Sequence, residues 1–177
     1  MRLLLHICCA PCLIYPLEVL KAEGFKVSGL FYNPNIHPLK EYTERKNALA
    51  GLKSAIDFIY SEYAPQDFFR EINFKEDAQL RCPICWKQRL RKTANIARKN
   101  GFKYFTTTLL VSPYQDHESL KCIGNEVAKE EGVEFYYADF RGGFRKAHEE
   151  ARAQGLYTQK YCGCVYSQIE RFAKKNA

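Results

Sequence analysis

Several features are scarce or absent in this sequence, and each absence narrows the possible functions. No apolar run is long enough to span a membrane, and the apolar stretch Leu3–Ile7 is too short for a signal peptide. Cysteines follow this stretch where a nucleotide-binding fold has a glycine-rich phosphate loop, and we find no repeat or low-complexity linker. We therefore expect a cytoplasmic protein with no membrane contact and no bound ATP, built as one domain over residues 1–177.

Acidic residues are also few, since the chain has 20 of them against 27 lysines and arginines and a formal net charge of +7. Such an excess suggests a polyanionic partner. From Arg81 to Lys103 there are eight basic residues and no acidic one. A phosphate backbone could dock on this segment, although we expect about half of its charges only to solvate a helix face. The candidate RNA contacts in it are Arg89, Arg91 and Lys92.

Short apolar runs alternate with amphipathic stretches along the chain, and glycines follow several of those stretches. Single helices between strands are typical of βαβ units, which build a parallel sheet with helices on both faces. We therefore predict an α/β fold with a mostly parallel, five-stranded sheet that binds its ligands beyond the carboxyl ends of the strands. The predicted strands are Arg2–Ile7, Lys26–Phe31, Asp57–Tyr60, Lys103–Leu109 and Glu134–Ala138. The predicted helices are Leu13–Glu23, Leu39–Ala55, Cys85–Asn100, His117–Glu131, Phe144–Gln154 and Val165–Lys174.

Seven of the eight cysteines form three tight groups, which are Cys8-Cys9-x-x-Cys12, Cys82-x-x-Cys85 and Cys162-Gly163-Cys164. A tetrahedral zinc or a four-iron cluster takes four thiolates, so the chain has more thiols than one such centre needs. In a reducing compartment, close cysteines are metal ligands or catalytic redox pairs more often than structural disulfides. The first group follows the first strand, at the predicted ligand-binding edge.

Adjacent cysteines in extended backbone point in different directions, and a cluster can accept them at two of its irons more easily than one small ion can. We therefore favour Cys8, Cys9, Cys82 and Cys85 as ligands of a [4Fe–4S] cluster. In a competing assignment Cys12 replaces one of them. Alternatively, Cys12 is an inert buried thiol.

Two cysteines at positions i and i+2 with a glycine between them can form a small strained ring or chelate one ion. Strain makes such a disulfide easily reduced, so we interpret Cys162 and Cys164 as a redox pair, with cluster ligation as the alternative. Cys122 lies alone within a predicted helix and is expected to be a small core side chain. His6, at the end of the first strand, is expected to be hydrogen-bonded beside the site rather than a ligand.

Five segments together resemble the cobalamin-independent epoxyqueuosine reductases of the QueH type, and they occur in the same order over essentially the whole chain. They are Leu5–Cys12, Phe31–Ile36, Cys82–Cys85, Asp139–Arg141 and Tyr161–Ser167. The resemblance implies a HUP-like (Rossmann-like) domain with a [4Fe–4S] cluster that reduces the epoxide of epoxyqueuosine in tRNA, the last step of queuosine synthesis. It also implies that Cys8, Cys9, Cys82 and Cys85 hold the cluster and that Cys162 and Cys164 are redox-active.

Removal of an epoxide oxygen needs two electrons and two protons, whereas one [4Fe–4S] cluster passes one electron at a time. The electrons would come from an external donor. The dithiol of Cys162 and Cys164 could supply the missing electron pair. Alternatively, it could hold an additional mononuclear iron together with Cys12 or the Asp139 carboxylate.

Protons for this reaction could come from Tyr161, Tyr166 or Asp139, and Arg141 could hold a phosphate or a sugar hydroxyl of the tRNA. Two other functions stay open. An iron–sulfur tRNA sulfurtransferase would need an ATP loop of the Ser-Gly-Gly-x-Asp-Ser type, and this chain has cysteines at that place. A non-enzymatic, zinc-stabilised RNA-binding module would be colourless and contain zinc.

Overall fold

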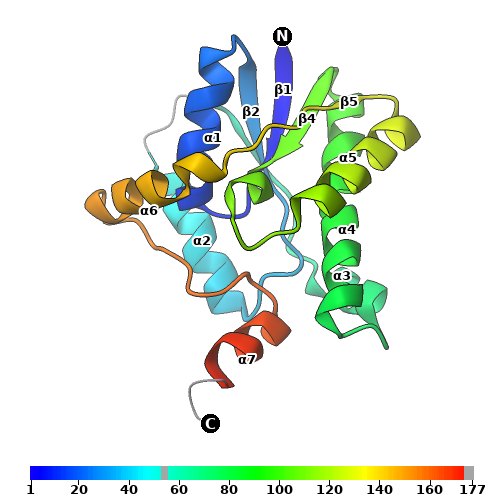
Figure 1. Cartoon of the computed structure of the whole chain (residues 1–177), viewed down its shortest axis with the longest axis vertical. Coiled ribbons are helices and arrows are strands. Elements are labelled where there is room, and N and C mark those ends of the chain that lie inside the picture. The colour runs from blue at the N-terminus through cyan, green and yellow to red at the C-terminus, as the bar shows by residue number, and fades with distance from the viewer. Residues whose placement is uncertain (53–55, 174–177) are drawn as a thin grey trace.

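A computed structural model describes residues 1–52 and 56–173. Five parallel strands form one sheet in the order β3-β2-β1-β4-β5, with β1 in the centre (Figure 1). In the register of the sheet, Leu5 lies opposite Gly29 on one side and Thr106 on the other. The strands are β1 Arg2–His6, β2 Lys26–Phe31, β3 Phe58–Tyr60, β4 Tyr104–Thr107 and β5 Glu134–Phe135. The predicted α/β fold with a parallel five-stranded sheet is confirmed.

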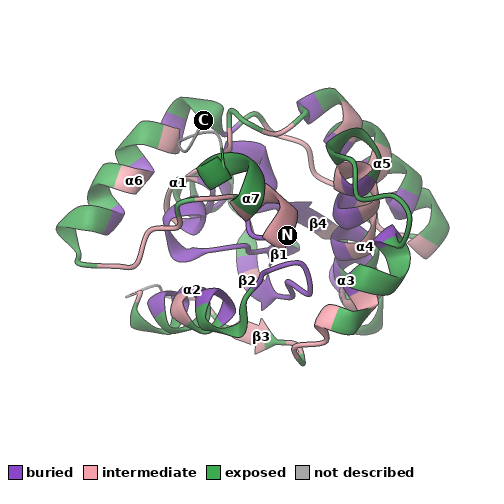
Figure 2. Ribbon diagram, turned by 90° about the horizontal axis from the view of Figure 1, so that it is seen from below, coloured by how far each residue is buried: buried purple, intermediate pink, exposed green. Residues whose placement is uncertain are grey.

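Helices cover both faces of this sheet (Figure 2). They bury the side chains of the central strand on both sides, as a parallel sheet requires. On one face α1 packs against α6, and on the other α4 packs against α5 and against the strands β1 and β4. Within the described part of the chain, no helix is both long and apolar enough to cross a bilayer. The helices are α1 Ala10–Ala22, α2 Leu39–Gly51, α3 Pro65–Ile72, α4 Ala78–Lys99, α5 His117–Glu131, α6 Phe144–Ala153 and α7 Val165–Ala173. Two short 3₁₀ helices are η1 Thr108–Val111 and η2 Arg141–Gly143.

Several predicted boundaries were wrong, each for a local reason. The fourth strand ends at Thr107 because the Thr107 hydroxyl accepts a hydrogen bond from the Leu109 amide and begins η1. The fifth strand stops at Phe135, and α1 begins at Ala10 rather than Leu13. The predicted ends of two helices, at Ala55 and Lys174, lie outside the described residues.

The largest correction concerns α4, which starts at Ala78, seven residues before the predicted start at Cys85. The Asp77 carboxylate accepts a hydrogen bond from the Gln79 amide at 2.8 Å and caps the helix. Pro83 lies inside the helix near its start rather than before it. Cys82 and Cys85 are therefore three residues apart on one helix, so both side chains lie on the same face.

The last described helix, α7, lies beyond the carboxyl edge of the sheet, at the bottom of Figure 1. In the view from below in Figure 2, it lies in front of the end of the central strand. The loop before α7 is attached to the loop after β2, because the His37 amide donates to the Gly163 carbonyl at 2.8 Å. This arrangement brings the first and the last cysteine groups to the same edge.

Candidate functional site

Three thiols meet in the turn between β1 and α1. The Sγ atoms of Cys8, Cys9 and Cys12 all lie within 4.8 Å of one another, and the three residues are buried. Cys9 is the residue before α1, and Cys12 lies in the first turn of that helix, which places it beside the pair. Among the described residues this is a group of possible metal ligands, and it includes Cys12, whose role the sequence left open.

The three thiols differ in how readily they lose a proton. Hydrogen bonds from Cys12 and Cys9 lower the pKa of Cys8 well below its usual value, and Thr108 donates a further bond to the Cys8 sulfur at 3.4 Å. Burial raises the pKa of Cys9, and the bond that Cys12 donates to Cys8 raises the pKa of Cys12. Cys8 therefore loses its proton most readily of the three, and thiolates are what soft metal centres bind.

The second pair of thiols comes from the start of α4. Cys85 is buried and Cys82 is half-buried. Desolvation raises the pKa of Cys82 to about 11 and that of Cys85 to about 12, and the nearby charges of Cys162 and Cys164 add to both shifts. Cys82 and Cys85 thus face the C-terminal pair.

In that C-terminal pair, Cys162 is exposed, whereas Cys164 is buried in an apolar cluster with Phe68, Ile72 and Cys85. Gln115 donates from Nε2 to the Cys162 sulfur at 3.7 Å. Desolvation by the protein around it raises the pKa of Cys162, so this thiol keeps its proton near neutral pH.

Gly163, between the two cysteines, has a φ of 150°, which side chains rarely adopt. A Cβ atom there would lie 3.1 Å from Cγ1 of Ile36. The Val165 amide, just beyond the pair, donates to Nδ1 of His37 at 3.4 Å. The loop after β2 therefore holds the Cys162–Cys164 segment closely.

A buried ion pair holds the same segment from α2. Arg45 is 1% exposed, and its Nε lies 2.7 Å from Oε1 of Glu41. Its other nitrogens donate to the carbonyl oxygens of Cys162 at 2.9 Å and Tyr161 at 3.0 Å. Glu41 also accepts a bond from the Tyr157 hydroxyl at 2.5 Å. Sequence reasoning missed this network because its two residues on α2 lie more than a hundred residues before their partners in the C-terminal segment.

A cavity of about 680 Å³ opens beside these thiols and is lined by Cys8, Cys12 and Cys162. Basic side chains from the C-terminal quarter of the chain surround it, and Glu170 is the one carboxylate among its described lining residues. Such a cavity favours an anionic substrate. The basic residues, which sequence reasoning also missed, are Arg152, Lys160 and Arg171.

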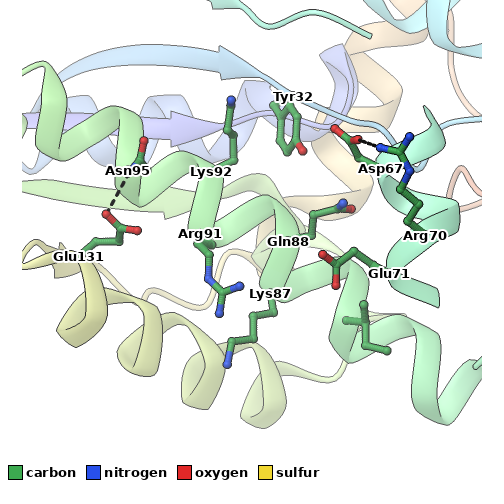
Figure 3. Close-up of a pocket in the computed structure, with 11 residues that line it drawn as sticks. Tyr32, Asp67, Arg70, Glu71, Lys87, Gln88, Arg91, Lys92, Asn95 and Glu131 are labelled. Atoms are coloured by element: carbon green, nitrogen blue, oxygen red, sulfur yellow. Dashed lines mark hydrogen bonds and ion pairs between the residues drawn. The ribbon is translucent and has the colours of Figure 1, made fainter. Parts of the chain in front are cut away.

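The predicted RNA contacts on α4 fall into two groups. Arg89 is 1% exposed and donates from Nε to the Cys85 carbonyl at 3.2 Å, so its burial leaves no surface for a phosphate to contact. Arg91 and Lys92 are exposed and line a groove of about 600 Å³ between α3 and α4, where Lys92 lies beside the ring of Tyr32 (Figure 3). Carboxylates of α3 and α5 also line this groove, so its charge is mixed.

The predicted proton donors are less suited to that role. Asp139 and Arg141 form an ion pair at 2.5 Å and do not line the cavity described above. The Arg141 guanidinium lowers the pKa of Asp139 to about 2, which keeps the group a carboxylate near neutral pH. Tyr161 does line the cavity, but its hydroxyl donates to the His37 carbonyl and burial raises its pKa to about 12.

Two residues outside the thiol groups were interpreted from sequence. His6 is fully buried and satisfied, with Nδ1 2.9 Å from the Thr107 hydroxyl and Nε2 3.1 Å from the Tyr32 carbonyl oxygen, as predicted. Cys122 was expected in the core, but it is exposed. It follows Leu120, on the buried face of α5, by two positions and therefore points away from the core.

The donor set fits an iron–sulfur cluster. Thiolate sulfur is the usual ligand of such clusters, and five of the seven thiols in the three groups are buried from water. A buried nitrogen among them, Nη2 of Arg89, has no hydrogen-bond partner. A group with negative charge would give that nitrogen a partner.

Together, the sheet and the thiols define a Rossmann-like α/β protein with a thiol-rich centre at the carboxyl edge. The fold is similar to a crystal structure from Methanocaldococcus jannaschii described as a predicted subunit of tRNA methyltransferase, with a TM-score of 0.55 and 9% identity over 86% of this chain and 76% of that one. A family model described as "Epoxyqueuosine reductase QueH" matches residues 3–170. The chain belongs to this family of enzymes.

Curated relatives agree with that assignment. Epoxyqueuosine reductase QueH of Dehalococcoides mccartyi is 40% identical over 99% of this chain and 97% of its own length. The proteins of the same name from Haemophilus influenzae and Thermotoga maritima are 38% and 35% identical, and the alignments cover 94% and 97% of this chain and 71% and 92% of those proteins.

Proposed function

We propose that this protein reduces the epoxide of epoxyqueuosine in tRNA to the cyclopentene of queuosine. The observation that carries the proposal is the cavity into which Cys162 and the buried group of Cys8 and Cys12 open together. It combines redox-capable sulfur with basic walls, as the reduction of a polyanionic substrate requires. A tRNA substrate would place the reaction in the cytoplasm.

In this proposal Cys8, Cys9, Cys82 and Cys85 hold a [4Fe–4S] cluster. Such a cluster supplies electrons one at a time from an external donor. The position of Cys12 within 4.8 Å of the first pair supports the alternative in which it replaces one ligand. The donor set contains sulfur and no histidine nitrogen, which also suits iron–sulfur chemistry.

Cys162 and Cys164 are redox-active in this scheme. Their oxidation from two thiols to a disulfide releases two electrons and two protons, which match the conversion of the epoxide to an alkene and water. The raised pKa of Cys162 supports this role, because the exposed thiol keeps a proton that it can give to the epoxide oxygen. An additional mononuclear iron held by Cys12, Cys162 and Cys164 is the alternative use of the same sulfurs.

The basic side chains around the cavity would hold the tRNA backbone near the modified base. We add Arg152, Lys160 and Arg171 to this role because they line the cavity itself. Arg91 and Lys92 would be outlying contacts in the groove between α3 and α4, and Arg141 stays a candidate phosphate contact. Arg89 is left out because of its burial.

The test is anaerobic reconstitution of the protein with iron and sulfide, followed by incubation with a reductant and epoxyqueuosine-containing tRNA. We expect nucleoside mass spectrometry to show loss of one oxygen, and Cys162→Ser to abolish that loss. Cys122→Ser, which removes a remote exposed thiol, is the matched control. An unchanged nucleoside despite a fully loaded cluster would refute the proposal.

The same samples separate the alternatives. A gain of sulfur that depends on ATP would indicate a sulfurtransferase, whereas a colourless protein that contains zinc would indicate an RNA-binding module. Iron clearly above four atoms per chain would support the additional mononuclear iron.

A further inference from the structure

Arg89 is a buried cation without a carboxylate partner. Its side chain comes from the middle of α4 and donates from Nε to the Cys85 carbonyl at 3.2 Å. Nη2 is buried and has no partner, and no ion pair of Arg89 occurs among the described residues. An unpaired guanidinium is costly to bury, so its place in the core needs an explanation.

The surroundings of Arg89 supply that explanation. The titratable groups that interact with its charge are the thiols of Cys85, Cys162 and Cys8, which come from three separate segments of the chain. His6 does not compensate this charge, because burial lowers the pKa of its ring to about 4 and keeps it neutral. The guanidinium therefore lies among thiols that become negative when they bind metal.

Arg45 provides a contrast within the same site. It too is 1% exposed, but the buried Glu41 carboxylate compensates its charge at 2.7 Å. Arg89 has no such carboxylate, so its positive charge is free to act on the thiol-rich centre. The two arginines thus have different roles, although both are buried next to cysteines.

We propose that Arg89 is a positioning residue whose buried charge balances that of the cysteine-bound cluster and raises its reduction potential. This inference rests on the cluster of the proposed function. Four thiolates carry more negative charge than an iron–sulfur core carries positive charge, so the loaded centre is an anion. Reduction adds another negative charge, which a fixed cation favours strongly in an environment that excludes water.

The experiment compares Arg89→Gln, which removes the charge, with Arg89→Lys, which keeps it. The control is Arg98→Gln, which removes an exposed charge from the far end of the same helix. All proteins are reconstituted anaerobically, analysed for iron and sulfide, and titrated by absorbance and electron paramagnetic resonance. At the midpoint potential of the wild type, we expect the ratio of reduced to oxidised cluster to be at least tenfold lower in Arg89→Gln. For a one-electron couple, this ratio corresponds to a midpoint potential lower by 59 mV.

The lysine variant and the control should each stay within threefold of the wild type. An unchanged midpoint in a loaded Arg89→Gln protein would overturn the inference and leave the proposed enzyme intact. A wild-type protein that binds no iron would overturn both.

Folding of the metal-free variants is checked by circular dichroism. If Arg89→Gln does not fold, Arg89→Lys tests the inference instead. A tenfold change in its ratio of reduced to oxidised cluster would contradict a role for the charge alone. If both variants fold but neither loads iron, the shape of the guanidinium matters rather than its charge, and the inference is wrong. Loading by the lysine variant but not by the glutamine variant would support it.

Discussion

Replacing Arg45 with methionine should destabilise the protein strongly and release the redox segment. The side chain is 1% exposed, forms an ion pair with Glu41 at 2.7 Å, and donates to the carbonyl oxygens of Tyr161 and Cys162. Methionine is close to arginine in volume but has no charge or hydrogen-bond donor. The Arg45→Met variant therefore leaves the buried Glu41 carboxylate without a counter-charge and leaves two backbone acceptors without their donor.

The expected loss follows from these contacts. Removing one partner of a buried ion pair costs about 3–5 kcal/mol, most of which reflects the charge that stays behind. We expect a loss of about 4 kcal/mol in the free energy of unfolding, a large share of the roughly 5–15 kcal/mol of a typical domain. Because the uncompensated Glu41 causes most of this loss, Glu41→Gln in the same chain should recover roughly 2 kcal/mol.

The measurement is urea denaturation of the metal-free, reduced protein, with the wild type, both single variants and the double variant forming a cycle. A loss below about 1 kcal/mol for Arg45→Met would refute the reasoning. The reasoning would also be refuted if the losses of the two single variants added up to the loss of the double variant within about 0.5 kcal/mol. Such additivity would show that Arg45 and Glu41 do not interact.

Three further predictions concern single residues. Gly163→Ala should lower the free energy of unfolding by about 1–3 kcal/mol, measured in urea, because its Cβ would approach Ile36 with a φ of 150°. Burial lowers the pKa of His37 from 6.5, so the unfolded chain binds more protons and stability should fall as pH drops below 6.5. His37→Gln should weaken that dependence in urea titrations from pH 7 to 5, and equal slopes would contradict the assignment. Cys122→Ser should leave iron content unchanged by chemical analysis, whereas Cys9→Ser should lower it.

The strands were predictable because apolar runs such as Leu3–Leu5 are buried on both faces and bounded by turns. The start of α4 could not be predicted, because Asp77 caps the helix although Pro83, which usually disrupts a helix, lies inside it. The helix α3 was also missed, although Phe68 and Ile72, its buried residues, lie four positions apart as one helix face requires.

The cysteines of the candidate site could be predicted from the sequence, but its buried arginines could not. The position of Cys8 after a central strand indicates the carboxyl edge, because parallel strands present their ligand sites there. No local pattern distinguishes the buried Arg89 from the exposed Arg91 two positions later, because only tertiary packing decides which side of the helix faces the sheet. The link from Arg45 to Cys162 spans more than a hundred residues and is likewise visible only in the fold.

The convergence of three distant cysteine groups also orders events during synthesis. A ribosome makes Cys8 and Cys9 before the α4 thiols, and it makes the segment held by Arg45 last of the three. At roughly 5–20 residues per second, on the order of ten seconds separate the first group from the last. Until then, the early thiols lack the segment that covers the carboxyl edge of the sheet. Delivery of metal is therefore expected to follow synthesis of the segment with Cys162 and Cys164, when all three groups can come together around it.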